Sequence, residues 1–541
     1  MLEHSSFLKF SLPKTLNVLY NANRNGWFTI FPTLFMMKPL TIVAPHSFEP
    51  SFEKTLLSLT TSDLVERMVI ISPEPVHLKI PKGRVLAAGP LHSQETLRLM
   101  LGEVRTKYLL LLPGSQQISI EPEGLEKLLD KTLSTKAGLA YSDYYDERER
   151  EKTVHPLCDY QPGSVRDDFD FGAIMLFSVS AVREALRKYG VVSGTKFAGL
   201  YDVRLRVSID HAVYHLQEPL YSIIRNVEES RVLPAGRQEL PPQEEIFAYV
   251  DPRNEAAQDE MEIVFTDYLK RIGAYLPPDH FKEVGKVTEF FPVEASIIIP
   301  VRNRKETIAE AVKSALSQET DFPFNVIVVD NHSADGTTAI LSDLARQYSS
   351  LKHIIPKRTD LGIGGCWNEA IQDKVCGRYA VQLDSDDLYS NHYTLQKMVS
   401  MLRGSNDAMV IGSYTVVDTR LQEVPPGLVD HQEWTDENGH NNALRINGLG
   451  APRAFNTSLM RSIGFLNVSY GEDYAAALRI SREYRIGRIY ESLYLCRRWS
   501  GNTDAALSVG EANRNNAFKD KIRTDEILAR QKIAEGIAHG A

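Results

Sequence analysis

Two short apolar runs, each ending in proline, begin two similar stretches of the chain. They are LTIVAP at 40–45 and SIIIP at 296–300. An amphipathic helical pattern and a second apolar run follow each of them, over 52–71 and 307–329. Strand, helix and strand at this spacing predict a βαβ unit, and strands that are apolar throughout suit a parallel sheet covered on both faces. The chain is therefore predicted to belong to the α/β class.

The similarity between the two stretches continues in the same order. Four further pairs of segments match, namely 106–116 with 377–387, 171–185 with 449–463, 205–208 with 478–481, and 218–221 with 491–494. Four matches in one order favour a tandem duplication with mostly parallel central sheets. Two unrelated α/β domains that share strand composition are the alternative.

The segment between the two stretches differs in composition. Pro-rich runs, which are typical of boundaries, occur at 233–245 and 275–280, with a helical pattern over 254–276 between them. The charged, helical end of the chain is predicted to cap a domain, a partner helix being the alternative. The predicted units are a first domain at 1–227, a connector with one helix at 228–293, a second domain at 294–504 and a helical C-terminal extension at 505–541.

Composition and charge narrow the class of protein. The 541 residues include 61 Lys and Arg against 70 Asp and Glu, a formal charge of −9, with 43% hydrophobic residues. These values exclude a disordered or fibrous chain. The acidic balance argues against a nucleic-acid partner, since such proteins usually carry a basic face.

Cysteine usage and the lack of long apolar runs predict the compartment. The four cysteines are far apart without a C-x-x-C pair, so neither a disulfide scaffold nor a zinc site is expected. The most apolar early run, 27–37, is interrupted by Pro32, and no run approaches the ~20 residues of a membrane helix. We expect no secretory signal, no integral membrane segment and a cytoplasmic protein, free or peripheral to the membrane.

The most informative motif is YAVQLDSDDLY at 379–389. It predicts a buried strand whose carboxyl end delivers Asp384, Ser385 and Asp386, followed by a third carboxylate. Ligands of open α/β sheets bind at that end of the strands, and clustered carboxylates repel one another unless cations offset them. Their oxygens suit Mg²⁺ or Mn²⁺ bridged to substrate phosphates. A solvated acidic turn that caps the next helix is the alternative.

Residues at the ends of two neighbouring strands are predicted to line the same edge. PVRNR at 300–304 places Arg302 and Asn303 there. Asp330 ends the next strand, where its carboxylate can accept hydrogen bonds from a nucleobase. The alternative is a turn in which Ser333 or Asp335 caps the following helix.

Glycines precede a helix within 358–371, where backbone N–H groups could approach a phosphate. Glu472 and Asp473 begin a later helix, either as a general base or because acids favour helix N-termini. Near the end, Arg498 can neutralise a departing diphosphate and Trp499 can stack on a sugar, a buried structural Trp being the alternative.

Taken together, the motifs of 294–503 resemble the family 2 glycosyltransferases, which have the GT-A fold. They are SIIIPVRNR, VIVVDNHSADGT, LGIGGCWNEAI, YAVQLDSDDL, YGEDYAAALRI and CRRWSGN, in that order. The resemblance implies inverting transfer of a sugar from a nucleotide diphosphate, often UDP, to a hydroxyl of a glycan, lipid-linked or small-molecule acceptor. It also implies a divalent metal.

The resemblance assigns roles to individual residues. Asp473 matches the base, with Glu472 beside it, and Asp386 matches the usual metal ligand together with Asp384. Donor-binding positions are Pro300, Arg302, Asn303, Asp330, Asp384, Ser385, Arg498 and Trp499. The Gln that precedes R-W in many synthases is absent, which argues against a processive polysaccharide synthase.

The first stretch, about 38–227, then resembles a degenerate copy of the same fold. Pro113, Gly114, Ser115 and Gln116 stand where the second stretch has its acidic motif. Asp202 aligns with Asp473. We expect this copy to lack metal-dependent transfer, a second, metal-independent transferase being the alternative.

Two other function classes stay open for the whole chain. A sugar nucleotidyltransferase should carry a Gly-rich basic loop after its first strand, and PVRNRKE contains no glycine. A non-catalytic nucleotide-sugar-binding protein would not need the acidic motifs.

Overall fold

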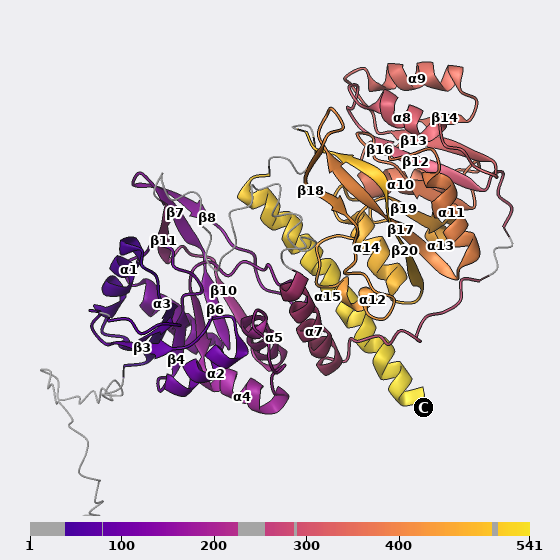
Figure 1. Cartoon of the computed structure of the whole chain (residues 1–541). Helices are drawn as coiled ribbons and strands as arrows, with labels where there is room; N and C mark the ends of the chain where they lie inside the picture. The colour runs from indigo at the N-terminus through magenta and orange to yellow at the C-terminus, as the bar shows by residue number, and fades with distance from the viewer. Residues whose placement is uncertain are drawn as a thin grey trace, which may run out of the picture.

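The computed structural model describes residues 38–77, 79–225, 255–285, 289–499, 502 and 507–540. The apolar run at 27–37 and the Pro-rich run at 233–245 lie outside these ranges. We call 38–225 the N-terminal half and 289–499 the C-terminal half. Figure 1 shows each half built around its own sheet, with the long helix α15 (Val509–Gly540) running alongside the C-terminal half.

The N-terminal half contains a seven-stranded, mostly parallel sheet. Across the sheet its strands are β10 (Val213–Leu216), β6 (Leu139–Ser142), β9 (Met175–Ser178), β4 (Tyr108–Leu111), β1 (Leu40–Pro45), β2 (Val65–Ser72) and β3 (Gly83–Ala87). A second, four-stranded sheet has the order β5 (Ile118–Ile120), β11 (Tyr221–Ile224), β7 (Tyr144–Arg148) and β8 (Glu151–His155). The helices are α1 (Pro50–Thr60), α2 (Gln94–Glu103), α3 (Gly124–Thr135), α4 (Val179–Tyr189) and α5 (Gly199–Asp210).

The C-terminal half contains a nine-stranded sheet. Its order is β14 (Leu351–Ile354), β13 (Phe324–Asp330), β12 (Ala295–Val301), β15 (Tyr379–Gln382), β19 (Arg453–Asn456), β17 (Asp407–Val417), β20 (Arg485–Arg497) and β16 (Leu388–Tyr389), with β18 (Glu423–Val429) paired to β17. The helices are α8 (Ile308–Leu316), α9 (Thr337–Gln347), α10 (Ile363–Gln372), α11 (Thr394–Gly404), α12 (Gly439–Asn442), α13 (Thr457–Ile463) and α14 (Glu472–Ser481).

Seven strands of each half follow the same order. Strands β3-β2-β1-β4-β9-β6-β10 correspond one by one to β14-β13-β12-β15-β19-β17-β20. In both sheets the fifth strand in this order is antiparallel to its two neighbours, and the other pairs are parallel. The predicted α/β class is confirmed, and the shared order supports the duplication that the sequence predicts.

The central strands are apolar because both faces of the sheet are covered. Ile297, Ile298 and Ile299 in β12 are fully buried, as are Ile42 and Val43 in β1. Each fully buried side chain of this size contributes about 1.5–3 kcal/mol to folding. The continuous apolar run at the start of each stretch was predicted to be a parallel strand covered on both faces, and this prediction is confirmed.

The two halves share a core through two further helices. The predicted connector helix is α7 (Glu255–Arg271), and its Phe265 packs in one cluster with Leu205 of α5 and with residues of the C-terminal half. Helix α15 joins the same cluster through Ile527. It also contains a buried ion pair between Asp520 and Arg523, whose charged atoms are 2.8 Å apart. The predicted helical C-terminal extension is confirmed, and it packs against both halves.

Among the described residues, no helix is long and apolar enough to cross a membrane. The four cysteines are free thiols.

Candidate active site

The acidic loop follows strand β15 at the carboxyl edge of the sheet, as predicted. Gln382 ends the strand and donates from Nε2 to both carboxylate oxygens of Asp384, at 3.0 and 3.1 Å. The hydroxyl of Tyr494 lies 2.9 Å from the backbone nitrogen of Asp384. Ser385 is buried, and its carbonyl accepts a hydrogen bond from Thr307. The loop is thus held from three elements of the C-terminal half.

The carboxylate of Asp386 lies close to hydrogen-bond donors of two side chains. Its Oδ2 is 3.4 Å from the indole nitrogen of Trp499 and 3.4 Å from Nε of Arg304. Its side chain is only 13% exposed. Trp499 therefore neighbours the acidic loop rather than packing in a remote core.

The acidic loop carries more negative charge than its neighbours offset. Burial, followed by the charges of Asp386 and Asp384, raises the pKa of Asp387 well above its usual range. Burial and the Asp386 charge also raise the pKa of Asp384. Buried carboxylates that raise one another's pKa in this way would be stabilised in their ionised form by a cation bound beside them.

Donor chemistry shows that the loop fits a divalent ion bound together with a substrate. In the described part of the chain, no group of three or more His, Cys, Asp or Glu side chains is placed to hold a metal ion by itself. Mg²⁺ is commonly bound through one or two carboxylates, with phosphates and water as the remaining ligands. Asp386 and Asp384 supply that number of carboxylates.

Asp330 lies at the end of β13, as predicted, but it is fully buried. Its two oxygens accept from the backbone N–H of Ser333 and from the hydroxyl of Thr338, and Nε2 of His353 lies at 3.4 Å. Burial alone would raise the pKa of Asp330, but these hydrogen bonds hold it well below the usual range. In this structure Asp330 therefore orders the turn that follows β13.

The segment after β12 forms part of the same turn. Asn303 adopts a left-handed backbone with φ of 54°, and its Oδ1 accepts from the backbone of Ala334 at 2.8 Å. Pro300 is half-buried and Arg302 is exposed. The loops after β12 and β13 are thus tied together at one edge of the sheet, which leaves Arg302 on its surface.

Glu472 and Asp473 form the first turn of α14, after the left-handed Gly471. Asp473 is half-buried, and its Oδ2 forms an ion pair with Arg453 at 2.7 Å. Burial would raise the pKa of Asp473, but the charges of Arg453 and Lys519 hold it below its ordinary value. Asp473 is therefore a carboxylate at neutral pH, the state that a base requires.

Glu472 behaves in the opposite way. It is buried, and its Oε2 has no hydrogen-bond partner in the described structure. Burial and the Asp473 charge raise its pKa to about 8. At neutral pH the pair thus combines a largely protonated Glu472 with an ionised Asp473.

A chain of contacts joins the acidic loop to the start of α14. Gln382 holds Asp384 and accepts a hydrogen bond from Arg453 at 3.0 Å, and Arg453 pairs with Asp473. Asp384 and Asp473, predicted as metal ligand and base, are therefore joined by one chain of contacts. The sequence pattern missed Gln382, Arg453 and Arg304.

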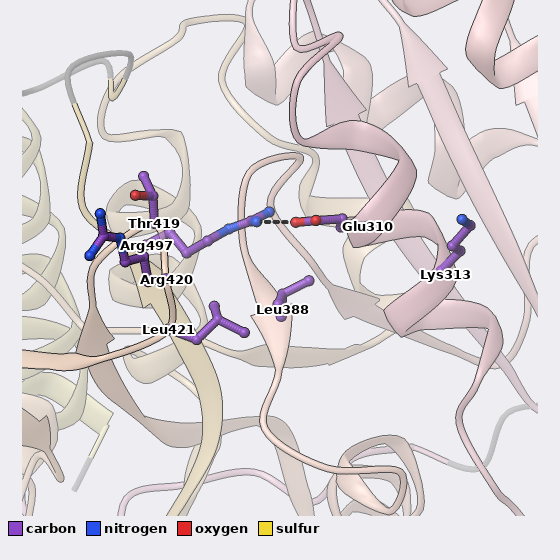
Figure 2. Close-up of a pocket in the computed structure, with 7 residues that line it drawn as sticks. All are labelled: Glu310, Lys313, Leu388, Thr419, Arg420, Leu421 and Arg497. Atoms are coloured by element: carbon purple, nitrogen blue, oxygen red, sulfur yellow. Dashed lines mark hydrogen bonds and ion pairs between the residues drawn. The ribbon is translucent and has the colours of Figure 1, made fainter.

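A cavity of about 460 Å³ lies beside the acidic loop (Figure 2). Arg497 connects the two, because it donates to the Asp386 carbonyl and pairs with Glu310 across the cavity wall. The lining residues are Glu310, Lys313, Leu388, Thr419, Arg420, Leu421 and Arg497. None of them is a predicted site residue, so the cavity lies beside the candidate site. Arg498, next along the chain, is half-buried, and its backbone N–H donates to Val417.

The glycines at the start of α10 allow close packing. The N–H of Gly362 donates to the Asn467 side chain at 2.8 Å, and that of Gly364 donates to the Val468 carbonyl at 3.0 Å. A Cβ at Gly364 would lie 1.9 Å from the Leu466 carbonyl oxygen, so only glycine fits there. The phosphate-binding alternative for these two amides is therefore not supported in this structure.

The predicted equivalence of Asp202 and Asp473 is wrong. Helix α5 begins at Gly199 and α14 at Glu472, so Leu200 occupies the position of Asp473. Asp202 lies further along α5, is buried and pairs with Arg206 at 2.6 Å.

Comparison with known proteins agrees with these observations. Residues 296–461 match the model of the family described as Glycosyl transferase family 2. The uncharacterized protein Rv1520 of Mycobacterium tuberculosis is 30% identical over 107 residues, which is 20% of this chain and 31% of that protein. The putative glycosyltransferase EpsE of Bacillus subtilis is 30% identical over 124 residues, 23% of this chain and 44% of that protein. The alignments thus span less than half the length of these relatives.

Among solved structures, that of S. aureus TarS 1-349 in complex with UDP-GlcNAc is 23% identical, with a TM-score of 0.34, over 44% of this chain and 72% of that one. The family match covers β12 to α13 and includes the acidic loop. Residues 296–461 of this chain are therefore similar to glycosyl transferase family 2 domains.

Proposed function

We propose that the C-terminal half is an inverting glycosyltransferase that moves a sugar from a nucleotide-diphosphate donor, with UDP as the favoured nucleotide, to an acceptor hydroxyl. The observation that carries this proposal is the contact chain from Asp384 through Gln382 and Arg453 to Asp473. It supports a site in which Asp384 acts on the donor side and Asp473 on the acceptor side, next to or within the segment that matches the family 2 model.

The proposed reaction is a single displacement. The acceptor oxygen attacks the anomeric carbon from the face opposite the diphosphate, and the bond from that carbon to the phosphate oxygen breaks. Asp473 accepts the proton of the acceptor hydroxyl, a role for which its ionised state suits it. The nucleoside diphosphate leaves with the electron pair.

The residues of the acidic loop suit the leaving group. Asp386 and Asp384 would hold Mg²⁺ or Mn²⁺, which when bound neutralises charge on the diphosphate. Arg304 lies 3.4 Å from Asp386, where its positive charge would act on the same phosphates. Trp499 lies beside the same carboxylate, where its ring would contact the sugar.

For the N-terminal half we propose a degenerate GT-A-like fold that contributes no metal site. Its support is the shared strand order together with Pro113 to Gln116 at the position of the acidic loop. Its packing against α7 and α15 suits a role in holding the catalytic half or in positioning an acceptor, whether glycan, lipid-linked or small molecule.

The test uses the full chain with UDP-glucose, UDP-N-acetylglucosamine and GDP-mannose, each with Mn²⁺ and with EDTA. We expect release of the nucleoside diphosphate from at least one donor, suppressed by EDTA. NMR of the transferred sugar should show an inverted anomeric configuration. Release of pyrophosphate would indicate a nucleotidyltransferase instead, and tight donor binding without turnover of any donor, in the presence of acceptor sugars, would indicate a binding protein.

A further inference from the structure

Gln382 and Arg453 face each other across two antiparallel strands. Gln382 is the last residue of β15 and Arg453 is the first residue of β19, one step beyond the paired residues Val381 and Ala454. Strand ends fix backbone position, and the planar amide and guanidinium groups leave few ways to vary the contact between them. The two side chains therefore form a rigid link at the edge of the sheet.

Each end of this link holds a carboxylate. The amide of Gln382 donates to both oxygens of Asp384, and its carbonyl oxygen accepts from Nη1 of Arg453 at 3.0 Å. Nη2 of Arg453 forms an ion pair with Oδ2 of Asp473 at 2.7 Å. One buried link thus joins the two carboxylates to which the proposed reaction gives different tasks.

Burial makes this arrangement expensive for folding. Gln382 is 6% exposed and Arg453 9%, and Nε of Arg453 has no partner in the described structure. Buried charged groups are often no better for stability than apolar side chains of similar volume. Stability alone therefore does not account for a buried Arg at this position.

The N-terminal half shows what the fold accepts at the same two positions. Tyr108 and Tyr379 begin the equivalent strands β4 and β15, so Leu111 corresponds to Gln382. The register pairs Leu111 with Met175, which therefore corresponds to Arg453. Both are buried in an apolar cluster, so the same strand pair forms without any polar link.

We propose that Gln382 and Arg453 are positioning residues that fix the separation between the carboxylates of Asp384 and Asp473. This inference rests on the proposed glycosyltransferase function. The link aligns the donor held at the acidic loop with the acceptor oxygen beside Asp473. Misplacement of reacting groups by about 1 Å can cost on the order of 10²-fold in rate.

The test replaces each residue by its apolar counterpart from the N-terminal half, as Arg453→Met and Gln382→Leu in the full chain. With the donor that wild type uses best and Mn²⁺, we expect kcat to fall about 10²-fold in Arg453→Met. The KM for the donor should change much less, because donor contacts are retained. Arg453→Lys keeps the positive charge and should recover part of kcat.

Two measurements separate a positioning role from a structural one. Thermal unfolding without metal should show Arg453→Met and Gln382→Leu folded with Tm close to that of wild type. Arg403→Met is the matched control, since Arg403 pairs with Glu294 beside the amino end of β12, at the opposite edge of the sheet. It should leave kcat unchanged.

Wild-type kcat in both apolar variants would overturn the proposal while leaving the glycosyltransferase function intact. Equal losses in the Arg403 control, or a loss in KM alone, would overturn it as well. If Arg453→Met does not fold, Gln382→Leu and Arg453→Lys decide the question by the same kcat comparison. Absence of transfer and of donor hydrolysis by wild type would instead refute the proposed function and, with it, this inference.

Discussion

The two halves use one strand order for different purposes, and the difference is concentrated at the carboxyl edge of the sheet. In the C-terminal half the ends of β15 and β19 carry Gln382 and Arg453, and in the N-terminal half the same positions carry Leu111 and Met175. The central strands of both sheets are equally buried. The polar groups of the C-terminal half are therefore not required by the sheet itself, and such departures are expected at functional sites.

The N-terminal half places its polar groups elsewhere. The two ring nitrogens of His215 on β10 lie within hydrogen-bond distance of Asp143, at 2.8 Å, and of Asp159, at 2.7 Å. The segment that includes Asp159 continues to Gln161, which donates to the Ala517 carbonyl on α15. In this half the polar contacts tie a loop to the C-terminal helix, whereas in the other half they surround a candidate site.

The largest effect that tests this comparison is expected from Asp473→Asn. The amide keeps the shape of the side chain but cannot accept the acceptor proton, so kcat should fall by roughly 10²–10⁴-fold, the usual contribution of a general base. Binding of UDP with Mn²⁺, measured by calorimetry, should stay the same. Unchanged turnover would remove Asp473 as the base.

Asp386→Ala should act at the other end of the site. Loss of a metal ligand should weaken Mn²⁺-dependent UDP binding at least as much as the 10–100-fold typical of outer-shell partners of metals. Titration of UDP with and without Mn²⁺ measures this effect. Asp343→Ala, an exposed carboxylate on α9, is the control and should bind as wild type does. Equal metal-dependent binding by Asp386→Ala would exclude this residue as a ligand.

Local sequence signals predicted the elements and the acidic loop. Continuous apolar runs identified β1 and β12, and the loop after β15 was visible because its carboxylates are close together in sequence. Gln382 and Arg453 are 71 residues apart and meet only through the pairing of β15 with β19, which no short pattern encodes. Register and burial decide such contacts, so the sequence alone could not supply them.

Alignment by residue type failed where tertiary contacts decide the role. Asp202 was matched to Asp473, yet it lies deeper in its helix and neutralises Arg206. Asp330 is at its predicted strand end, but its oxygens are used by the following turn. A carboxylate near a predicted site thus needs its hydrogen-bond partners before a role can be assigned. The role of Asp330 in recognition of the nucleobase stays a prediction.

Glu472→Gln is expected to affect stability rather than turnover or binding. Because the pKa of Glu472 is raised from 4.5 to about 8 in the folded protein, the folded state binds more protons than the unfolded state between these values. Stability is therefore lost as the pH rises from about 4.5 to 8. The neutral amide should remove roughly 2–4 kcal/mol of this pH dependence, since one pKa unit corresponds to about 1.4 kcal/mol. Urea unfolding of wild type and variant at pH 5 and pH 8 measures this difference in unfolding free energy. The same pH dependence in both proteins would contradict the raised pKa of Glu472.

The smallest effect is expected from Ser115→Ala combined with Gln116→Ala in the N-terminal half. These residues occupy the positions of Asp386 and Asp387 after the equivalent strand β4, and neither supplies a carboxylate. Substitution of polar side chains away from a site usually changes free energies by no more than about 0.5 kcal/mol. Mn²⁺-dependent UDP binding should therefore differ from wild type by less than about twofold. The same calorimetric titration used for Asp386→Ala provides the comparison. A lower number of UDP molecules bound per chain would show a second nucleotide site at the end of β4. The two halves would then be two binding sites that differ in the polarity of their sheet edges, and not a scaffold and a catalyst.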